Sequence, residues 1–267
     1  MQETYIELVP RSGESLQTDM QRVESMNIAF QGYNLPELKR PKTSFLTPEQ
    51  MMAMRQQGEL ARGKKLALHL RTQERDVAQN IDRIHHLAHH GVDIALLVTG
   101  DAFDPTQEPA TCAHNVLEGI QAPIENIELA VGADLYMPEW GRWRRKNEAM
   151  QRGIVSATFT QPVFHPQVLE TFTENTRYLS PEKIYAGITW VTNGKSRDYW
   201  QTMNNVPSKY LPSGEADDTI RRNSISQAAD TLKLVRQQGY SAYVMLMRGS
   251  LEDLQEIFAT AENIREY

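Results

Sequence analysis

Short runs of apolar and β-branched residues alternate along the chain with longer runs in which apolar positions recur at helical spacing. Several of the short runs are nearly continuous in apolar residues, as is typical of parallel strands buried on both faces. The expected strands are 4–9, 27–31, 64–70, 93–99, 126–132, 155–161, 183–189 and 241–247. The longer runs predict helices at 14–25, 48–61, 74–90, 109–120, 142–152, 166–177, 195–203, 220–238 and 251–264.

Glycine and proline positions agree with this division. Gly91, Gly153 and Gly239 each follow a helical run and precede a strand, where glycine commonly ends a helix. The Thr-Pro-Glu sequence at 47–49 is typical of a helix start. Eight strand–helix units predict an α/β fold, a (β/α)8 TIM barrel, as a single domain over 1–267. A doubly wound open sheet is disfavoured, because no Gly-rich phosphate loop follows the first strand.

Composition and charge narrow the classes of partner. The formal net charge of −6 argues against nucleic acid or an anionic membrane as a partner. No run approaches the ~18 apolar residues of a membrane helix, and the first residues lack the pattern of a signal peptide. The one cysteine, Cys112, excludes an internal disulfide framework and favours a reducing, cytoplasmic location. The His pairs within 85–90 lie near a helix end away from the expected active face, so we expect no metal site.

Polar residues gather where the expected strands end. In a barrel of this type the carboxyl ends of the strands form the active face. Polar side chains there are costly to bury unless they are paired or functional, so together they predict a polar ligand site. The residues are Glu7, Gln31, His69, Arg71, Thr99, Asp101, Gln161, Thr192, Asn193 and Arg248.

Several of these residues stand in an ordered set of motifs. The set comprises Ile-Glu-Leu-Val-Pro at 6–10, His-Leu-Arg-Thr at 69–72, Leu-Val-Thr-Gly-Asp at 97–101, Thr-Gln-Pro-Val-Phe at 160–164 and Gly-Ile-Thr-Trp-Val-Thr-Asn at 187–193. In this order, over nearly the whole chain, the sequence resembles the methylenetetrahydrofolate reductases. The resemblance implies a barrel that reduces 5,10-methylenetetrahydrofolate to 5-methyltetrahydrofolate in one-carbon metabolism, with FAD as cofactor and NADH or NADPH as donor.

The resemblance also implies roles for individual residues. Glu7 matches the acid that protonates the folate as the one-carbon bridge opens, and a carboxylic acid there needs a raised pKa. Asp101 matches a catalytic aspartate between flavin and pterin. The residues implied to bind the folate substrate are Asp101, Gln161, Arg248 and Tyr199, and those implied to bind FAD are His69, Thr99, Gly100, Asp101, Tyr136 and Lys146.

Two segments depart from the family pattern and leave alternatives open. The residues at 30–36 replace a stretch that holds a flavin-contacting threonine, and the segment 134–146 replaces the usual contacts to the FAD phosphates. One alternative is therefore a flavin-free folate-binding protein that serves a methyl-transfer pathway or a partner subunit. Another is an oxidoreductase of the same barrel acting on another substrate. Whether the chain forms a homo-oligomer is left open by the sequence.

Overall fold

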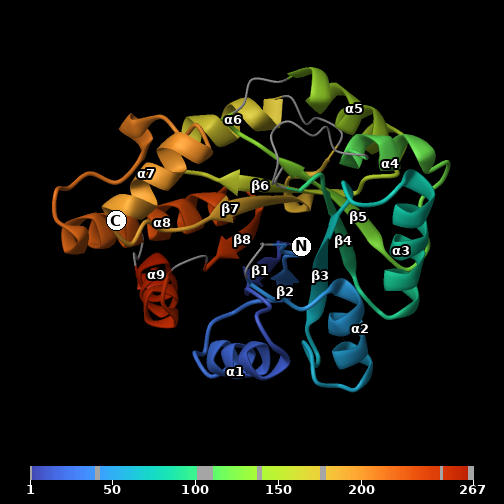
Figure 1. Ribbon diagram of the computed structural model, residues 1–267. Coiled ribbons are helices and arrows are strands. Elements are labelled where there is room, and N and C mark those ends of the chain that lie inside the picture. Colours follow the sequence, from blue (N-terminus) through green and yellow to red (C-terminus); the bar gives the residue numbers. More distant parts are fainter. Residues whose placement is uncertain are drawn as a thin grey trace.

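Eight parallel strands close into a barrel in chain order (Figure 1). The computed structural model describes residues 2–39, 43–100, 111–136, 140–174, 179–246 and 249–263. The strands are β1 (Thr4–Glu7), β2 (Gly32–Leu35), β3 (Lys65–Arg71), β4 (Ile94–Val98), β5 (Glu128–Ala133), β6 (Ala157–Pro162), β7 (Ile184–Ile188) and β8 (Ser241–Met245). β1 pairs with both β2 and β8, which closes the sheet and confirms the predicted (β/α)8 barrel.

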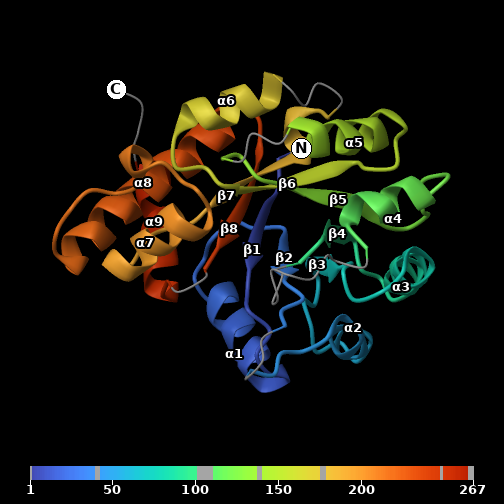
Figure 2. The same ribbon diagram turned by 45° about the horizontal axis from the view of Figure 1, so that its top comes forward.

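Helices form an outer ring around the strands in both views (Figures 1 and 2). They are α1 (Gly13–Glu24), α2 (Pro48–Gln56), α3 (Val77–His89), α4 (Ala113–Gly119), α5 (Trp140–Gln151), α6 (Pro166–Glu174), α7 (Gly194–Met203), α8 (Asp217–Gln237) and α9 (Leu251–Asn263). The connection from β7 to β8 holds both α7 and α8, and α8 lies beside α9. Each strand thus presents one face to the helices and the other to the barrel interior.

The predicted helix ends are largely confirmed. Thr47 caps α2 with a capping box to Gln50, and the three predicted C-terminal glycines all have positive φ, between 71° and 88°. The helix expected over 48–61 is too long, because α2 ends at Gln56. Beyond it, Arg55 donates to the carbonyl oxygens of Leu60 and Lys64, so that segment is held as a turn.

The second strand lies five residues later than the sequence predicts. Residues 27–31 do not form a strand: Asn27 takes a positive φ of 54°, and the Gln31 side chain accepts from the backbone of Thr4. The strand is β2, at Gly32–Leu35, where Tyr5 pairs with Gly32 and Glu7 with Asn34. This shift places Asn34 on a barrel strand next to Glu7.

Aromatic rings fill the lower part of the barrel interior. Phe159 stacks on Tyr185 with ring centroids 4.3 Å apart, and Tyr5 and Tyr243 meet this pair edge-on. A side chain at Gly32 would not fit, since its Cβ would lie 2.6 Å from the Tyr5 ring. The rings make a packed floor, so polar chemistry in the barrel is confined to the level above them.

Candidate active site

A buried carboxyl group lies directly above the aromatic floor. Glu7, the last residue of β1, is only 8% exposed, and its Oε2 accepts a hydrogen bond from the Tyr243 hydroxyl on β8. Tyr243 is 4% exposed, and burial beside Glu7 keeps its pKa well above the usual value of 10. The phenol therefore stays protonated and acts as a donor to the carboxyl group.

Two further side chains complete this polar cluster. Asn34 on β2 is fully buried, and its Nδ2 lies 2.8 Å from Nε2 of His69 on β3. His69 Nε2 lies 3.9 Å from Glu7 Oε2, beyond hydrogen-bond distance. Strands β1, β2, β3 and β8, which are neighbours in the barrel, thus bring one carboxyl, one amide, one imidazole and one phenol together.

Burial sets the protonation of this cluster. It raises the pKa of Glu7 to about 7, and the Tyr243 hydrogen bond offsets part of that rise. Burial also lowers the pKa of His69 to about 3, so the imidazole is neutral at physiological pH. At pH 7 the site therefore offers a carboxylic acid that is about half protonated, next to a neutral histidine.

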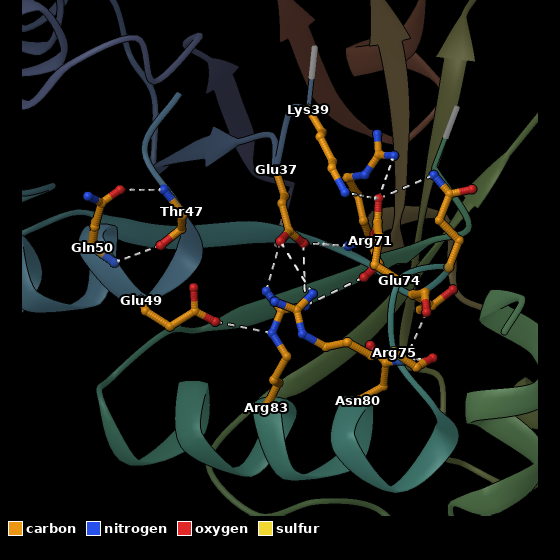
Figure 3. Close-up of polar contacts among 12 residues, drawn as sticks. Glu37, Lys39, Thr47, Glu49, Gln50, Arg71, Glu74, Arg75, Asn80 and Arg83 are labelled. Atoms are coloured by element: carbon orange, nitrogen blue, oxygen red, sulfur yellow. Dashed lines mark hydrogen bonds and ion pairs between the residues drawn. The ribbon is translucent and has the colours of Figure 1, made fainter. Parts of the chain in front are cut away.

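A network of ion pairs fixes the loops beside this cluster (Figure 3). Glu37, just after β2, accepts hydrogen bonds from the backbone N–H of Arg71 at 2.7 Å and from Arg83 Nη2 on α3 at 2.9 Å. Arg83 also reaches Glu49 on α2 at 3.2 Å. A groove of about 680 Å³ lies against this network. Its basic side chains are paired with Glu37 or Glu74; they are Lys39, Arg71, Arg75 and Arg83.

The Glu37 network should contribute measurably to stability. Replacing Glu37 by Gln leaves Arg83, whose side chain is 12% exposed, with the more exposed Glu49 as its one anionic partner among the described residues. We expect the free energy of unfolding to fall by about 2 kcal/mol in urea titrations. As a control, Glu252→Gln removes the ion pair with Arg22, in which both side chains are more than half exposed, and should leave the midpoint nearly unchanged. Equal effects of the two substitutions would contradict this account.

The expected residues at the end of β4 contact protein groups. The Thr99 hydroxyl accepts from the backbone N–H of Ala113 at 3.3 Å. Gly100 has a φ of 98°, and a Cβ there would lie 2.9 Å from the Arg71 guanidinium carbon. Glycine at 100 is therefore explained by the close approach of Arg71 and by its backbone conformation. Asp101 lies outside the described residues.

The expected residues near β5 are also engaged within the protein. The Tyr136 hydroxyl donates to the carbonyl of Pro162 at 2.9 Å and accepts from the N–H of Phe164. Lys146 on α5 donates through Nζ to the carbonyl oxygen of Gly132. Both side chains thereby tie the segment after β5 to neighbouring strands.

Two expected substrate contacts remain available for a ligand. Gln161, near the end of β6, is half-buried, and its side-chain amide has no hydrogen-bond partner among the described residues. Tyr199 on α7 is 40% exposed and packs edge-on against Trp200. Two of the strand-end residues have structural roles instead, since Asn193 caps α7 and Gln31 bonds the β1 backbone. Arg248 lies outside the described residues.

Two of the residues implied to bind FAD direct donors at protein atoms. The Tyr136 hydroxyl gives its one hydrogen to the Pro162 carbonyl, and Lys146 Nζ donates to the Gly132 carbonyl. His69 Nε2 and the Thr99 hydroxyl accept in their printed hydrogen bonds, so each of these side chains keeps a donor. The implied FAD contacts are therefore only partly matched by this arrangement. The described ranges also contain no group of three or more His, Cys, Asp or Glu side chains suited to hold a metal ion. No helix within them is both long and apolar enough to cross a membrane.

Sequence reasoning finds Glu7 and His69 but misses the hydrogen-bond partner of each, Tyr243 for Glu7 and Asn34 for His69. Tyr243 lies in the middle of an apolar strand, where a tyrosine is typical of core packing. Asn34 falls outside the strand predicted at 27–31, so its position beside Glu7 has no signal in the sequence. A strand placed at 32–35 would have revealed it, because alternation then puts Asn34 inside the barrel.

Two solved structures are similar to this chain over nearly its full length. An F420-dependent secondary alcohol dehydrogenase in complex with an F420-acetone adduct matches with a TM-score of 0.58 and 10% identity, covering 100% of both chains. Dihydropteroate synthase from Xanthomonas albilineans in complex with 7,8-dihydropteroate matches with a TM-score of 0.51 and 10% identity, covering 99% of this chain and 94% of that chain. No protein-family model and no curated protein sequence matches the chain. The similarity at this level of identity is one of fold, that of the TIM barrel.

Proposed function

We propose that this protein reduces a folate-bound one-carbon unit, converting 5,10-methylenetetrahydrofolate to 5-methyltetrahydrofolate with a nicotinamide donor. The observation that carries the proposal is Glu7, a buried carboxyl group above the barrel floor with a pKa raised to about 7. An acid of that pKa holds a proton near neutral pH and can still release it, as general acid catalysis requires. The substrate class is the one implied by the resemblance of the ordered motifs between residues 6 and 193 to the methylenetetrahydrofolate reductases.

In this proposal Glu7 gives its proton to the folate nitrogen as the carbon–nitrogen bond of the one-carbon bridge breaks. The bond's electron pair stays on that nitrogen, and the carbon is left as an iminium. Hydride that originates from the nicotinamide donor then adds to the iminium carbon and forms the methyl group; a flavin, where bound, would relay that hydride. Gln161 binds the pterin edge through its side-chain amide, and Asp101, Arg248 and Tyr199 are proposed as further substrate contacts.

The two comparison proteins support the choice of ligand class. The dihydropteroate synthase holds 7,8-dihydropteroate, which contains a pterin, and the dehydrogenase holds an adduct of the deazaflavin F420. Barrels of this fold therefore accommodate pterins and flavin-like cofactors. The test is an anaerobic assay in which methylenetetrahydrofolate is mixed with NADH or NADPH, with and without FAD. Formation of 5-methyltetrahydrofolate supports the proposal, and its absence with both donors refutes it.

A second candidate is a flavin-free folate-binding protein. It is favoured by the inward hydrogen bonds of Tyr136 and Lys146, which occupy groups implied to contact FAD. The visible absorption spectrum after incubation with FAD and removal of unbound ligand separates the candidates. Flavin bands near ~450 nm at about one per chain indicate a flavoprotein, since the flavin carries the hydride chemistry. A colourless protein that binds tetrahydrofolate without turnover indicates the second candidate, and turnover of another substrate would indicate the same-fold oxidoreductase.

A further inference from the structure

The two carboxyl oxygens of Glu7 differ in their hydrogen bonds. Oε2 accepts from the Tyr243 hydroxyl, whereas Oε1 has no hydrogen-bond partner in the part of the chain that the structure describes. A phenol has a single hydrogen, so a hydroxyl that donates to Oε2 cannot donate elsewhere. The direction of this hydrogen therefore decides which carboxyl oxygen carries the acidic proton.

The contacts of Tyr243 fix that direction. Among the described residues its hydroxyl has one hydrogen-bond partner, Glu7 Oε2, so its hydrogen is directed at that oxygen. Asn34 serves a different member of the cluster, because its Nδ2 lies 2.8 Å from His69 Nε2 and donates to the imidazole.

We propose that Tyr243 is a positioning residue that keeps the transferable proton of Glu7 on Oε1 and stabilises the carboxylate left after transfer. Before transfer, Oε2 is occupied as an acceptor, so the proton resides on Oε1. After transfer, the same hydrogen bond becomes charge-assisted and stronger. The catalytic part of this inference rests on the proposed function, but the hydrogen-bond arrangement does not.

No charged group among the described residues helps Tyr243 to stabilise the Glu7 carboxylate. Glu7 faces Asn34 on β2, His69 on β3, and Tyr243 and Met245 on β8. His69 is neutral, with its pKa lowered to about 3 by burial, so it supplies no positive charge to the carboxylate. The Tyr243 hydrogen bond is the one interaction that lowers the pKa of Glu7 against its burial.

The test is a direct titration of Glu7. Protein labelled with ¹³C at the glutamate carboxyl carbons is titrated by NMR, and the Glu7 signal is identified by its loss in Glu7→Gln. Tyr243→Phe should raise the titration midpoint by about one pH unit, because it removes a donor to the charged form. The matched control is Tyr5→Phe, another tyrosine buried in the barrel interior, whose hydroxyl has no partner among the described residues. That control should leave the midpoint unchanged.

Tyr243→Met provides a second variant in case Tyr243→Phe folds poorly. It also places an apolar side chain in the barrel interior and removes the same donor, so it should raise the midpoint as well. An unchanged or lowered midpoint in a folded Tyr243→Phe protein overturns the inference, as does an equal shift in Tyr5→Phe. If Tyr243→Phe does not fold, an unchanged or lowered midpoint in Tyr243→Met overturns it.

Measuring folate turnover beside the NMR titration distinguishes a failure of this inference from a failure of the proposed function. Tyr243→Phe should lower kcat about tenfold with little change in KM, and should move the alkaline limb of the kcat/KM profile upward by about one pH unit. A wild-type protein that does not reduce the folate refutes the proposed function while the NMR titration still decides the hydrogen-bond arrangement. Normal folate turnover with no shift in either titration refutes only the role of Tyr243.

Discussion

Replacing Glu7 by Gln should lower the rate of methylenetetrahydrofolate reduction by about 1,000-fold, within the range for loss of a general acid. The substitution keeps the shape of the side chain and an acceptor for the Tyr243 hydroxyl, so the barrel interior stays packed. What is lost is the proton that opens the one-carbon bridge. Steady-state kinetics near pH 7 measure the change in kcat, and calorimetry measures whether folate binding is kept.

The matched control for this substitution is Glu125→Gln, which makes the same chemical change at an exposed position. It should leave both rate and folate affinity as in the wild type. Binding in Glu7→Gln is expected to stay within about threefold, because the group acts mainly in the transition state. A variant that reduces folate at the wild-type rate would remove Glu7 from the mechanism.

The barrel follows from the sequence because its strands are apolar on both faces. Strands such as β4 pack one face on the helices and the other on the barrel interior, so their apolar runs are continuous and easily recognised. β2 lacks this signal, since Gly32 makes room for the Tyr5 ring and Asn34 serves the polar cluster. The segment 27–31 just before it is more strongly apolar, so the sequence pattern predicts the strand there instead.

The candidate site is predictable only where a polar residue ends a strand. Glu7 and His69 are conspicuous because charged or polar groups there are costly without a role. Tyr243 has no such mark, since a tyrosine inside an apolar strand is ordinary core, and its function depends on a contact 236 residues away along the chain. The inward hydrogen bonds of Tyr136 and Lys146 are likewise tertiary contacts that no local pattern encodes.

The same Glu7→Gln substitution should stabilise the fold at alkaline pH. Burial raises the pKa of Glu7 from 4.5 to about 7, so between these values the folded protein binds more protons than the unfolded chain. The contribution of Glu7 to stability is thus fully present below pH 4.5 and is lost as the pH rises through 7. A pKa shift of this size means that the wild type loses about 3 kcal/mol of folding stability as Glu7 ionises. The uncharged glutamine does not ionise, so the variant does not lose this stability.

Urea unfolding of both proteins between pH 5 and pH 9 measures this effect. His69 acts in the opposite sense, because its lowered pKa gives a contribution that is present above pH 6.5 and is lost as the pH falls through 3. Since His69 is present in both proteins, the difference between them isolates Glu7. We expect the free energy of unfolding of Glu7→Gln to rise by about 3 kcal/mol relative to wild type from pH 5 to pH 9. A difference that stays constant with pH would show that Glu7 titrates like an exposed carboxyl group, and the acid needed for folate reduction would then be absent from this position.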